Sequence, residues 1–406
     1  MHPTPARNTP LGTVVASALA QLVVGCGGGG ARSTADTATT ASAPPTTPTE
    51  ADRVAIGDKL FHEMRLSASG RQACATCHVQ ERGHADAKDS FLPLGGPNLD
   101  QQGTRSSPSL NYLNSNTAFR FDALGKPEGG FTWDGRADSR TAQAQAPLLA
   151  ANEMANADTA AVVRAVRALS YVSELLFAYS LPTNATDAQL MQATQQALAD
   201  YQAGDTDYQP YTSKFDYVQQ GRASFSAQEA RGLAVFNDAR RGNCSSCHTS
   251  TAPAGQTQAL FSNFGYFALG LPRNTSTATA NPRFFDMGLC GPTRTDLANR
   301  TDLCGLFKVP TLRNVALTAP YFHNGVVATL EDAVSFYATR DTNPARWYPV
   351  VGGVVQRFND LPAAYRTNIT QQAPFGQQPG DAPRLSAQDV ADVAAFLQTL
   401  TDGYTP

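Results

Sequence analysis

Two short motifs that combine a cysteine pair with a histidine are the part of the sequence best suited to chemistry. They read Cys-Ala-Thr-Cys-His, ending at His78, and Cys-Ser-Ser-Cys-His, ending at His248. Two thiols at this spacing can add to the vinyl groups of one haem, and the adjacent histidine can bind its iron. A four-thiolate zinc site and a thioredoxin-like dithiol are the alternatives, and the dithiol would need a βαβ setting that the sequence lacks. We therefore expect two covalently attached haem c groups, held by Cys74, Cys77 and His78 and by Cys244, Cys247 and His248.

The supply of further iron ligands is small, because the chain has only six histidines. His84 follows the first motif by six residues and should remain on the same side of the haem as His78. His62 precedes the motif in a helical segment, where a polar surface position is the simpler interpretation. The first haem is therefore expected to keep an open position, and an open iron can bind a small oxidant such as hydrogen peroxide.

The first 25 residues are typical of an export signal. Arg7 precedes the apolar segment 11–25, which is too short to cross a bilayer. The segment runs into Val-Val-Gly-Cys, which resembles the bacterial lipoprotein cleavage box and would place a lipid on Cys26; an ordinary cleaved signal peptide is the alternative. Residues 26–50 are rich in Gly, Thr, Ala and Pro, which is typical of a flexible tether. We expect an exported protein, periplasmic or anchored to the outer membrane, that touches the membrane only through this lipid.

The last two cysteines fit the same compartment. Cys290 and Cys304 remain once the motif cysteines and Cys26 have been assigned. Cysteines of an exported protein fold in an oxidising environment, where neighbouring thiols tend to pair. We therefore predict a structural disulfide between them.

The pattern of apolar residues predicts helices. Residues 162–176 place one apolar stripe on a helix, and strand-like alternation is scarce. Ser226, Thr329 and Ser386 each stand three positions before an acidic residue, as in a capping box at a helix start. Gly, Pro and Asn mark long loops between the helices. The predicted fold is mainly α and rich in loops.

Two related segments precede the two motifs. Residues 55–61 read Ala-Ile-Gly-Asp-Lys-Leu-Phe, and residues 230–236 read Ala-Arg-Gly-Leu-Ala-Val-Phe. We therefore predict two cytochrome c-like domains, at 51–215 and 216–406, each with one covalent haem. The length of 406 residues suits two domains, and the net charge of −3 gives no indication of a nucleic-acid partner.

The sequence resembles the bacterial di-haem cytochrome c peroxidases and their relative MauG, which matures the tryptophan-derived quinone of methylamine dehydrogenase. The resemblance covers nearly everything after the tether. Its most specific pieces are Phe-Thr-Trp-Asp-Gly-Arg-Ala at 131–137, Glu-Met at 153–154, Val-Pro-Thr-Leu-Arg-Asn-Val at 309–315 and Pro-Tyr-Phe-His-Asn-Gly at 320–325. It implies a peroxide-reactive haem in the first domain and an electron-transfer haem in the second.

The resemblance also implies roles for residues near the first haem. Trp133 would lie between the haems and relay electrons, whereas a buried core tryptophan is the simpler interpretation without the resemblance. Glu153 would move a proton between the two peroxide oxygens, a role that suits a desolvated carboxylate with a raised pKa. Taken alone, Glu153 would be a solvated charge at a helix end. Gln143 and Pro147 would be supporting contacts in the distal pocket.

Tyr337 points to the MauG-like branch of this family. Ordinary peroxidases of the group have a methionine ligand fourteen residues after the histidine that corresponds to His323, and that position is tyrosine here. A phenolate ligand lowers the reduction potential of iron relative to a thioether. Met287 is the rival ligand, and a hydrogen-bonded core tyrosine is the alternative without ligation. His323 would hydrogen-bond near a haem propionate or serve a structural role.

An inter-haem calcium ion is a further implication of the resemblance. Thr318 and Pro320 match two of the protein ligands in relatives. The third ligand there is an asparagine, and this chain has Ser106 at that position. The expectation of calcium is weakened accordingly.

These inferences predict a di-haem oxidoreductase that activates hydrogen peroxide at the His78 haem and draws electrons through a second haem held by His248 and Tyr337. The tyrosine favours a MauG-like task, the oxidation of side chains in a partner protein. The first alternative is peroxide detoxification with electrons from a small cytochrome c or copper protein. The second is a non-enzymatic di-haem electron carrier, which would need a distal ligand for the first haem that the six histidines make hard to supply.

Overall fold

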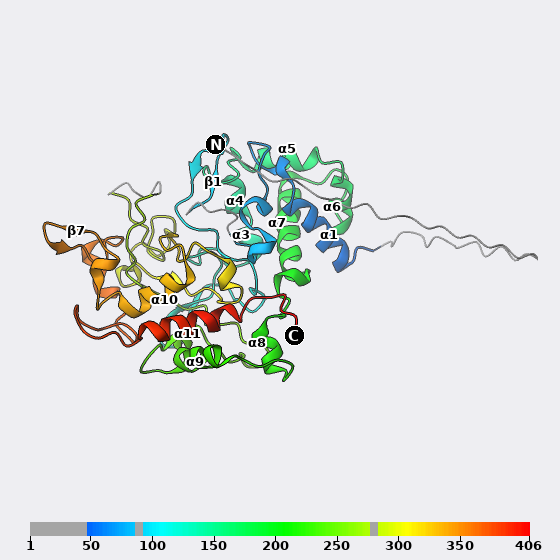
Figure 1. The fold of residues 1–406 in the computed structure, drawn as a ribbon. Coiled ribbons are helices and arrows are strands. Elements are labelled where there is room, and N and C mark those ends of the chain that lie inside the picture. The colour runs from blue at the N-terminus through cyan, green and yellow to red at the C-terminus, as the bar shows by residue number, and fades with distance from the viewer. Residues whose placement is uncertain (1–46, 86–91, 277–282) are drawn as a thin grey trace, which may run out of the picture. The chain divides into compact units, whose positions relative to one another are not determined.

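Helices joined by long loops dominate the computed structural model, which describes residues 47–85, 92–276 and 283–406 (Figure 1). The α-helices are α1 (Glu50–Phe61), α2 (Cys74–Cys77), α3 (Arg140–Gln143), α4 (Gln145–Leu149), α5 (Thr159–Arg167), α6 (Val172–Ala178), α7 (Asp187–Gly204), α8 (Lys214–Gln219), α9 (Ala227–Asn237), α10 (Leu330–Thr339) and α11 (Ala387–Gln398). The prediction of a mainly α, loop-rich fold is therefore confirmed. The expected signal peptide and the tether as far as residue 46 lie outside the described residues.

The strands are short and pair only locally. They form antiparallel two-stranded sheets: β1 (Leu94–Gly95) with β2 (Gln101–Gln102), β3 (Arg120–Phe121) with β4 (Pro127–Glu128), β5 (Tyr266–Phe267) with β6 (Phe307–Lys308), and β7 (Val350–Val351) with β8 (Val354–Val355). The β5–β6 pair matters for the site, because it brings residues 266–267 beside residues 307–308. None of the helices within the described ranges is long and apolar enough to cross a membrane.

Two large apolar cores hold the helices. The first is built by α1, α5, α6 and α7 and takes its residues from 54–208. The second is built by α9, α10 and α11 and takes its residues from 215–400. Residues 47–406 group into one compact unit, so the division into domains at residue 215 stays a prediction that the two cores support.

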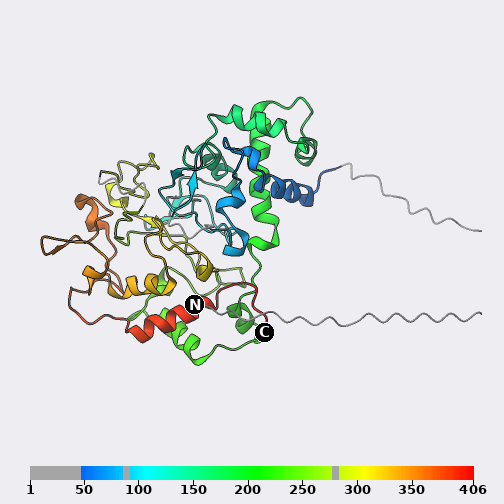
Figure 2. The ribbon, with the colours of Figure 1, turned by 45° about the horizontal axis from the view of Figure 1, so that its top comes forward.

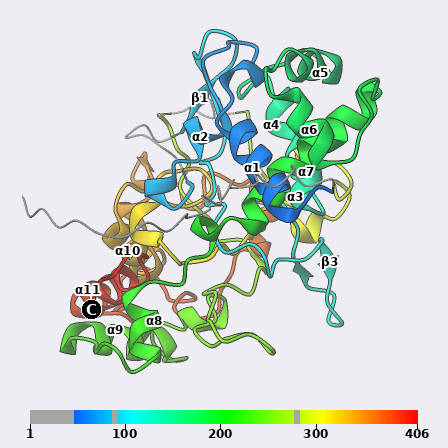
Figure 3. The ribbon, with the colours of Figure 1, turned by 90° about the vertical axis from the view of Figure 1, so that its right-hand side faces the viewer.

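The two related sequence segments form equivalent helix crossings. Gly57 of α1 faces Ala197 of α7, and Gly232 of α9 faces Asp392 of α11, so closely in each case that a Cβ atom would overlap a backbone carbonyl. A residue without a side chain is needed at both crossings, because only glycine lets the two backbones approach this far. Figures 1 and 2 show α11 (red) lying along α9 (green), and Figure 3 shows α1 beside α7.

Helix starts follow the predicted caps, whereas one predicted helix is divided. Ser226 and Ser386 form complete capping boxes, and Thr329 caps α10 by accepting from a backbone N–H. The stripe over 162–176 spans two helices, α5 and α6, rather than one. The break lies between Arg167 and Val172, and within it the buried Leu169 donates its backbone N–H to the Val166 carbonyl in a tight turn. The apolar period continues across the break because both helices pack on the same core.

Candidate active site

Each Cys-x-x-Cys-His motif lines a cavity of its own. The first motif lines a cavity of about 440 Å³, and the second lines one of about 240 Å³. None of the four motif cysteines is in a disulfide. Burial raises the pKa of both Cys74 and Cys244 to about 12, so these thiols are neutral at physiological pH. Paired thiols that face a cavity beside a histidine fit the covalent attachment of haem c.

The two motif histidines are oriented in the same way. Nδ1 of His78 lies 3.0 Å from the backbone oxygen of His84, and Nδ1 of His248 lies 3.0 Å from that of Phe261. A carbonyl oxygen only accepts, so each Nδ1 carries the hydrogen and each Nε2 keeps a lone pair for a metal. Burial lowers the pKa of both rings to about 4, which keeps them neutral. His84 therefore lies on the His78 side of the cavity, as predicted.

Three residues expected on the distal side line the first cavity. Gln143 ends α3, Pro147 lies in α4, and Glu153 lies in the loop that follows. The Glu153 side chain is exposed and borders the cavity. Desolvation raises the pKa of its carboxyl above the usual value, and the charge of Arg136 lowers it by a smaller amount. Among the described residues that line this cavity, His78 is the only histidine. The structure thus brings the expected residues together and places no second histidine among them.

The second cavity has a different wall. Tyr337 of α10 lines it together with His248, and no methionine is among the described residues that do so. Burial raises the pKa of the Tyr337 phenol, and the nearby thiols of Cys247 and Cys244 raise it further. Met287 packs in a separate apolar cluster and does not line this cavity. Ligation of iron by Tyr337 stays a prediction. Its rival, Met287, does not line the cavity and so is not placed to bind the same iron.

A local repeat explains why the two walls differ. Residues 131–137 and 321–327 form the same turn, each closed by an antiparallel bridge between its end residues. The second residue and the glycine have positive φ in both, with values of 74° and 61° at Thr132 and Gly135 and of 68° and 60° at Phe322 and Gly325. A capping residue, Ser139 or Thr329, then starts the next helix at the same distance.

The repeat sets residues of the two sites in register. Equivalent positions are 190 residues apart, as 131 is from 321. Trp133 therefore corresponds to His323, and Pro147 corresponds to Tyr337. Proline has no side-chain atom that can bind a metal, whereas a phenol has one. The same position in the repeat thus offers a ligand in the second cavity and none in the first.

Trp133 lies between the two cavities and lines both. Its Nε1 donates to the Ser106 carbonyl at 2.9 Å, and its ring lies 6.5 Å from the His323 ring. Ser106 is also tied to the second turn, because its N–H donates to the His323 carbonyl at 2.8 Å. These contacts fix the indole between the two cavities, and its role as an electron relay stays a prediction.

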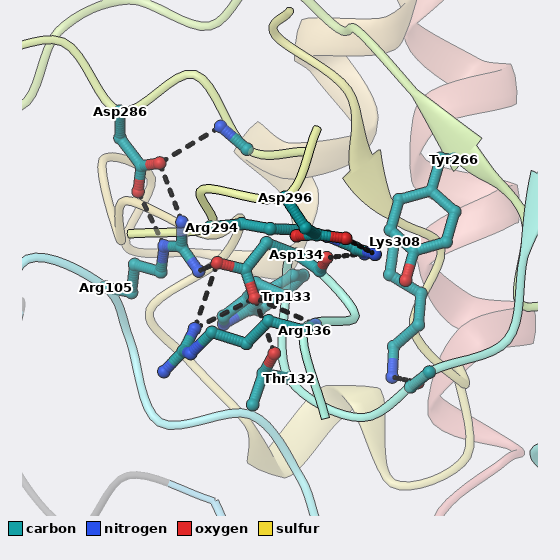
Figure 4. Close-up of polar contacts among 12 residues, drawn as sticks. Arg105, Thr132, Trp133, Asp134, Arg136, Tyr266, Asp286, Arg294, Asp296 and Lys308 are labelled. Carbon is teal, nitrogen blue, oxygen red and sulfur yellow. Dashed lines mark hydrogen bonds and ion pairs between the residues drawn. The ribbon is translucent and has the colours of Figure 1, made fainter. Parts of the chain in front are cut away.

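A buried ionic cluster holds the turn that carries Trp133 (Figure 4). Asp134 is fully buried and pairs with Arg105 and Arg136, each at 2.8 Å, while Thr132 donates to it at 2.6 Å. Arg105 also binds Asp286 through two hydrogen bonds, at 2.6 and 2.8 Å. Burial alone would raise the pKa of Asp134, but the two guanidinium groups lower it to about 2. The carboxylate is therefore charged at neutral pH and fixes the turn.

The sequence patterns did not select Lys308, just as they did not select Arg105. Lys308 lines both cavities. Its side-chain Nζ donates to the Gly130 carbonyl at 2.8 Å, and its backbone N–H donates to the Trp133 carbonyl at 2.9 Å. Burial lowers its pKa to about 7. The only sequence feature that could have pointed to these two residues is their position. Lys308 directly precedes the 309–315 motif, and Arg105 directly precedes Ser106.

His323 is placed to meet a polar group of a cofactor. The residue is buried, its ring stacks on Phe307 with centroids 3.4 Å apart, and its Nε2 has no hydrogen-bond partner in the described part of the chain. It also borders the second cavity. An unpaired polar atom in this position fits the predicted hydrogen bond near a propionate, because buried polar groups are normally paired.

The predicted calcium ligands do not form a convincing cation site. Thr318 and Pro320 border the second cavity, but the guanidinium of Arg82 donates to the neighbouring carbonyls of Leu317 and Ala319, at 3.3 and 3.1 Å. Ser106 donates its hydroxyl to a backbone oxygen at 2.9 Å. A positive charge already lies on this stretch of carbonyls, which disfavours a second cation beside it.

The predicted disulfide is confirmed: Cys290 and Cys304 are bonded. It closes a 14-residue separation next to the second cavity, where Gly305 is part of the wall. The bond ties together two loop segments that carry little regular structure of their own. Cross-linking such segments stabilises the folded chain.

Two cavities, each lined by a thiol pair and a neutral histidine, define a protein built to hold two c-type haems in different surroundings. The chain belongs to the di-haem cytochrome c peroxidase family. The sequence model of that family matches residues 51–224. Membership implies two c-type haems and a peroxidase-type oxidoreductase activity, which removes the non-enzymatic carrier from the alternatives.

Relatives of both functional kinds are similar to the chain. Methylamine utilization protein MauG of Paracoccus denitrificans is 34% identical over 372 residues, which cover 86% of this chain and 88% of the relative. The solved structure of the diheme peroxidase BthA of Burkholderia thailandensis is 35% identical with a TM-score of 0.80, and 88% of each chain is covered. Cytochrome c peroxidase Ccp of Escherichia coli is 26% identical over 368 residues, which cover 89% of this chain and 61% of that protein.

Proposed function

We propose that this chain uses hydrogen peroxide to oxidise side chains of a partner protein, as a MauG-like enzyme. One observation carries the proposal: Tyr337 lines the second cavity with His248, whereas the described residues of that wall include no methionine. A phenolate favours oxidised iron more than a thioether does, so it suits a site that stores oxidising equivalents. The 34% identity to a MauG protein over 372 residues supports the same conclusion.

The haems would be held by the motif cysteines, His78 and His248, with Tyr337 as the second ligand in the second cavity, and would supply the redox chemistry. In the first cavity, Glu153 takes a proton from the bound peroxide and delivers it to the distant oxygen. Its raised pKa suits this task, because a carboxyl that both accepts and returns a proton works best near the operating pH. Gln143 and Pro147 shape the cavity around the peroxide.

Trp133 carries electrons between the two cavities in this proposal. Its position in both walls, and the ionic cluster that fixes its turn, keep the indole in one orientation. His323 anchors the second cofactor through its unpaired Nε2. The domain division at residue 215 separates the peroxide-reactive half from the electron-transfer half.

Export completes the proposal. A disulfide between Cys290 and Cys304 is expected of a protein that folds in an oxidising compartment. We place the protein in the periplasm, or at the outer membrane through a lipid on Cys26. The partner would then be a protein of the same compartment.

Peroxide detoxification is the second candidate. It is favoured by the similarity to the diheme peroxidase BthA and to a cytochrome c peroxidase. In this case a small cytochrome c or copper protein would deliver the electrons.

Visible and near-infrared absorption separates the two candidates. Stoichiometric hydrogen peroxide is added to the fully oxidised holoprotein, with Tyr337→Met as the comparison. The proposal predicts immediate Soret bleaching and a near-infrared inter-haem band, both lost in the variant. A wild-type protein that reacts only after one haem has been reduced would reject the MauG-like function in favour of peroxide detoxification.

A further inference from the structure

Aromatic rings form a row that leads away from the proximal side of the first cavity. The His84 carbonyl accepts from Nδ1 of His78 at 3.0 Å, and the His84 ring stacks on Tyr208 with centroids 4.0 Å apart. The Tyr208 ring lies 5.2 Å from the ring of Tyr201. The row therefore leads from the backbone that holds His78 to two phenols.

The row ends beside the surface formed by α1 and α7, which lie side by side (Figure 3). Tyr201 lies 6.5 Å from the exposed ring of His62, measured between centroids. Burial raises the pKa of Tyr201, and the carboxylate of Asp58 raises it further, so that carboxylate lies near the phenol. Asp58 is itself half exposed and pairs with His62 at 3.0 Å. A proton acceptor in contact with water thus stands next to the last phenol.

Packing alone does not require phenols here. The Tyr208 hydroxyl is buried and makes no hydrogen bond of ordinary geometry to the described residues, although it and the Tyr201 hydroxyl are close enough to affect each other's pKa. Phenylalanine would fill the same space without burying an unpaired hydroxyl. The His84 ring is fixed by a 2.7 Å hydrogen bond between its Nδ1 and Asn111 Oδ1. Two oxidisable rings are therefore held at short separations, which favours transfer of single electrons because that rate falls steeply with distance.

We propose that Tyr201 and Tyr208 carry single electrons from a small donor at the α1–α7 surface to the first haem site, by a route that does not use Trp133. The inference rests on the peroxide chemistry proposed above. Reduction of hydrogen peroxide to two water molecules takes two electrons and two protons. When Tyr208 gives up an electron, its phenolic proton moves to the Tyr201 oxygen as the proton of Tyr201 moves to Asp58. Tyr201 then returns that proton and an electron to Tyr208, so the net change is one electron lost by Tyr201 and one proton gained by Asp58. One electron from the donor, with the return of that proton, restores the phenol.

Charge near the row indicates the kind of donor. Asp58 and Asp205 act on Tyr201, and Asp205 and Asp207 act on His84. Carboxylates at the surface end of the route repel anions. The route therefore suits a neutral or cationic one-electron donor, for which tetramethylphenylenediamine is a practical probe.

Spin trapping tests the route. The oxidised holoprotein is mixed with hydrogen peroxide and a nitroso spin trap, and covalent adducts are located by mass spectrometry. We expect an adduct on Tyr201 that falls at least about tenfold in Tyr208→Phe, where Tyr201 is still present. Tyr179→Phe is the control, because Tyr179 is likewise a phenol with a carboxylate partner, at 2.8 Å from Asp200, but lies outside the row. Excess tetramethylphenylenediamine should suppress the adduct on Tyr201.

The outcomes separate the two proposals. Peroxide consumption without an adduct on Tyr201, or an adduct that Tyr208→Phe or the donor leaves unchanged, overturns the tyrosine route and leaves the proposed function standing. Failure of the wild-type holoprotein to consume peroxide overturns both. Unchanged haem absorption in the Phe variants establishes that they are folded, and each substitution removes only a hydroxyl.

Discussion

The two haem cavities are built from the same parts and differ at a few equivalent positions. Both have a pair of partly buried thiols and a histidine whose Nδ1 is held by a backbone carbonyl at 3.0 Å. The repeat then sets Pro147 of the first cavity against Tyr337 of the second. The comparison shows that the fold repeats the paired thiols and the histidine, whereas one position of the repeat is a phenol in one cavity and a proline in the other. In the function proposed above, this position decides whether a cavity stays open to peroxide.

The turns that border the cavities differ in a second way. Asp134 of the first turn is a buried carboxylate paired with Arg105 and Arg136, while the equivalent residue of the second turn is Asn324. Asn324 donates to a backbone oxygen and to Asp360, at 3.0 Å each. Ion pairs of Asp134 thus hold the first turn, whereas hydrogen bonds of the Asn324 amide hold the second. Lowering the pH should therefore destabilise the two turns to different extents.

Pro147→Tyr is expected to remove the main difference between the cavities. A phenol at this position would occupy the open site, so the reaction with peroxide should slow by about a thousandfold, or about 4 kcal/mol of barrier. Stopped-flow absorption of the oxidised holoprotein measures this rate. Pro147→Leu adds bulk without a ligand atom and should retain most of the wild-type rate. Equal losses in the two variants would mean that bulk, rather than ligation, distinguishes the cavities.

Glu153→Gln should act on the first cavity alone. Loss of the proton carrier is expected to slow the peroxide reaction by about a hundredfold, while cyanide, which needs only the open site, still binds. Because the pKa of Glu153 is raised, the wild-type rate should increase with pH through a value above that of an ordinary carboxyl, as the acceptor form appears. This limb of the pH profile should vanish in the variant. Its persistence would assign the proton transfer to another group.

Asp134→Asn should weaken the first turn, with a smaller effect. We expect the free energy of unfolding to fall by about 3 kcal/mol at pH 7, because the guanidinium groups of Arg105 and Arg136 lose the charge of the fully buried carboxylate that they share. The folded pKa of Asp134, about 2, is below the unfolded value of about 3.9. Its contribution is therefore present above pH 4 and is lost as the pH falls toward 2.

Chemical denaturation at several pH values measures this effect. The difference between Asp134→Asn and the wild type should shrink between pH 4 and pH 2. Asp302→Asn is the control, since Asp302 pairs with Arg300 at the surface and should contribute no more than about 1 kcal/mol. A pH-independent difference would show that the charge of Asp134 does not hold the turn.

Features fixed by local spacing could be predicted from the sequence. The haem motifs depend on five consecutive residues, the caps at Ser226 and Ser386 depend on four, and the disulfide followed by elimination of the other cysteines. The resemblance to a known family selected Glu153, Trp133 and Tyr337, and the structure places all three on the expected cavities. Their chemical roles remain predictions.

Features that depend on distant contacts could not be predicted. Arg105 meets Asp286 across 181 residues, and Lys308 reaches Gly130 across 178, with no periodicity or motif to link the partners. The break between α5 and α6 was missed because both helices contribute to one apolar stripe. The row of His84, Tyr208 and Tyr201 is likewise set by packing between segments rather than by spacing within one.

Resonance Raman spectroscopy of the fully oxidised holoprotein tests whether Tyr337 binds iron and Pro147 leaves it open, with Tyr337→Phe and Pro147→Tyr as comparisons. We expect one set of iron-bound phenolate bands in the wild type, none in Tyr337→Phe and a second set in Pro147→Tyr. We also expect the wild-type protein to contain one five-coordinate haem or one with an exchangeable sixth ligand. Phenolate bands that persist in Tyr337→Phe, or their absence from the wild type, would contradict the assignment of Tyr337 as a ligand.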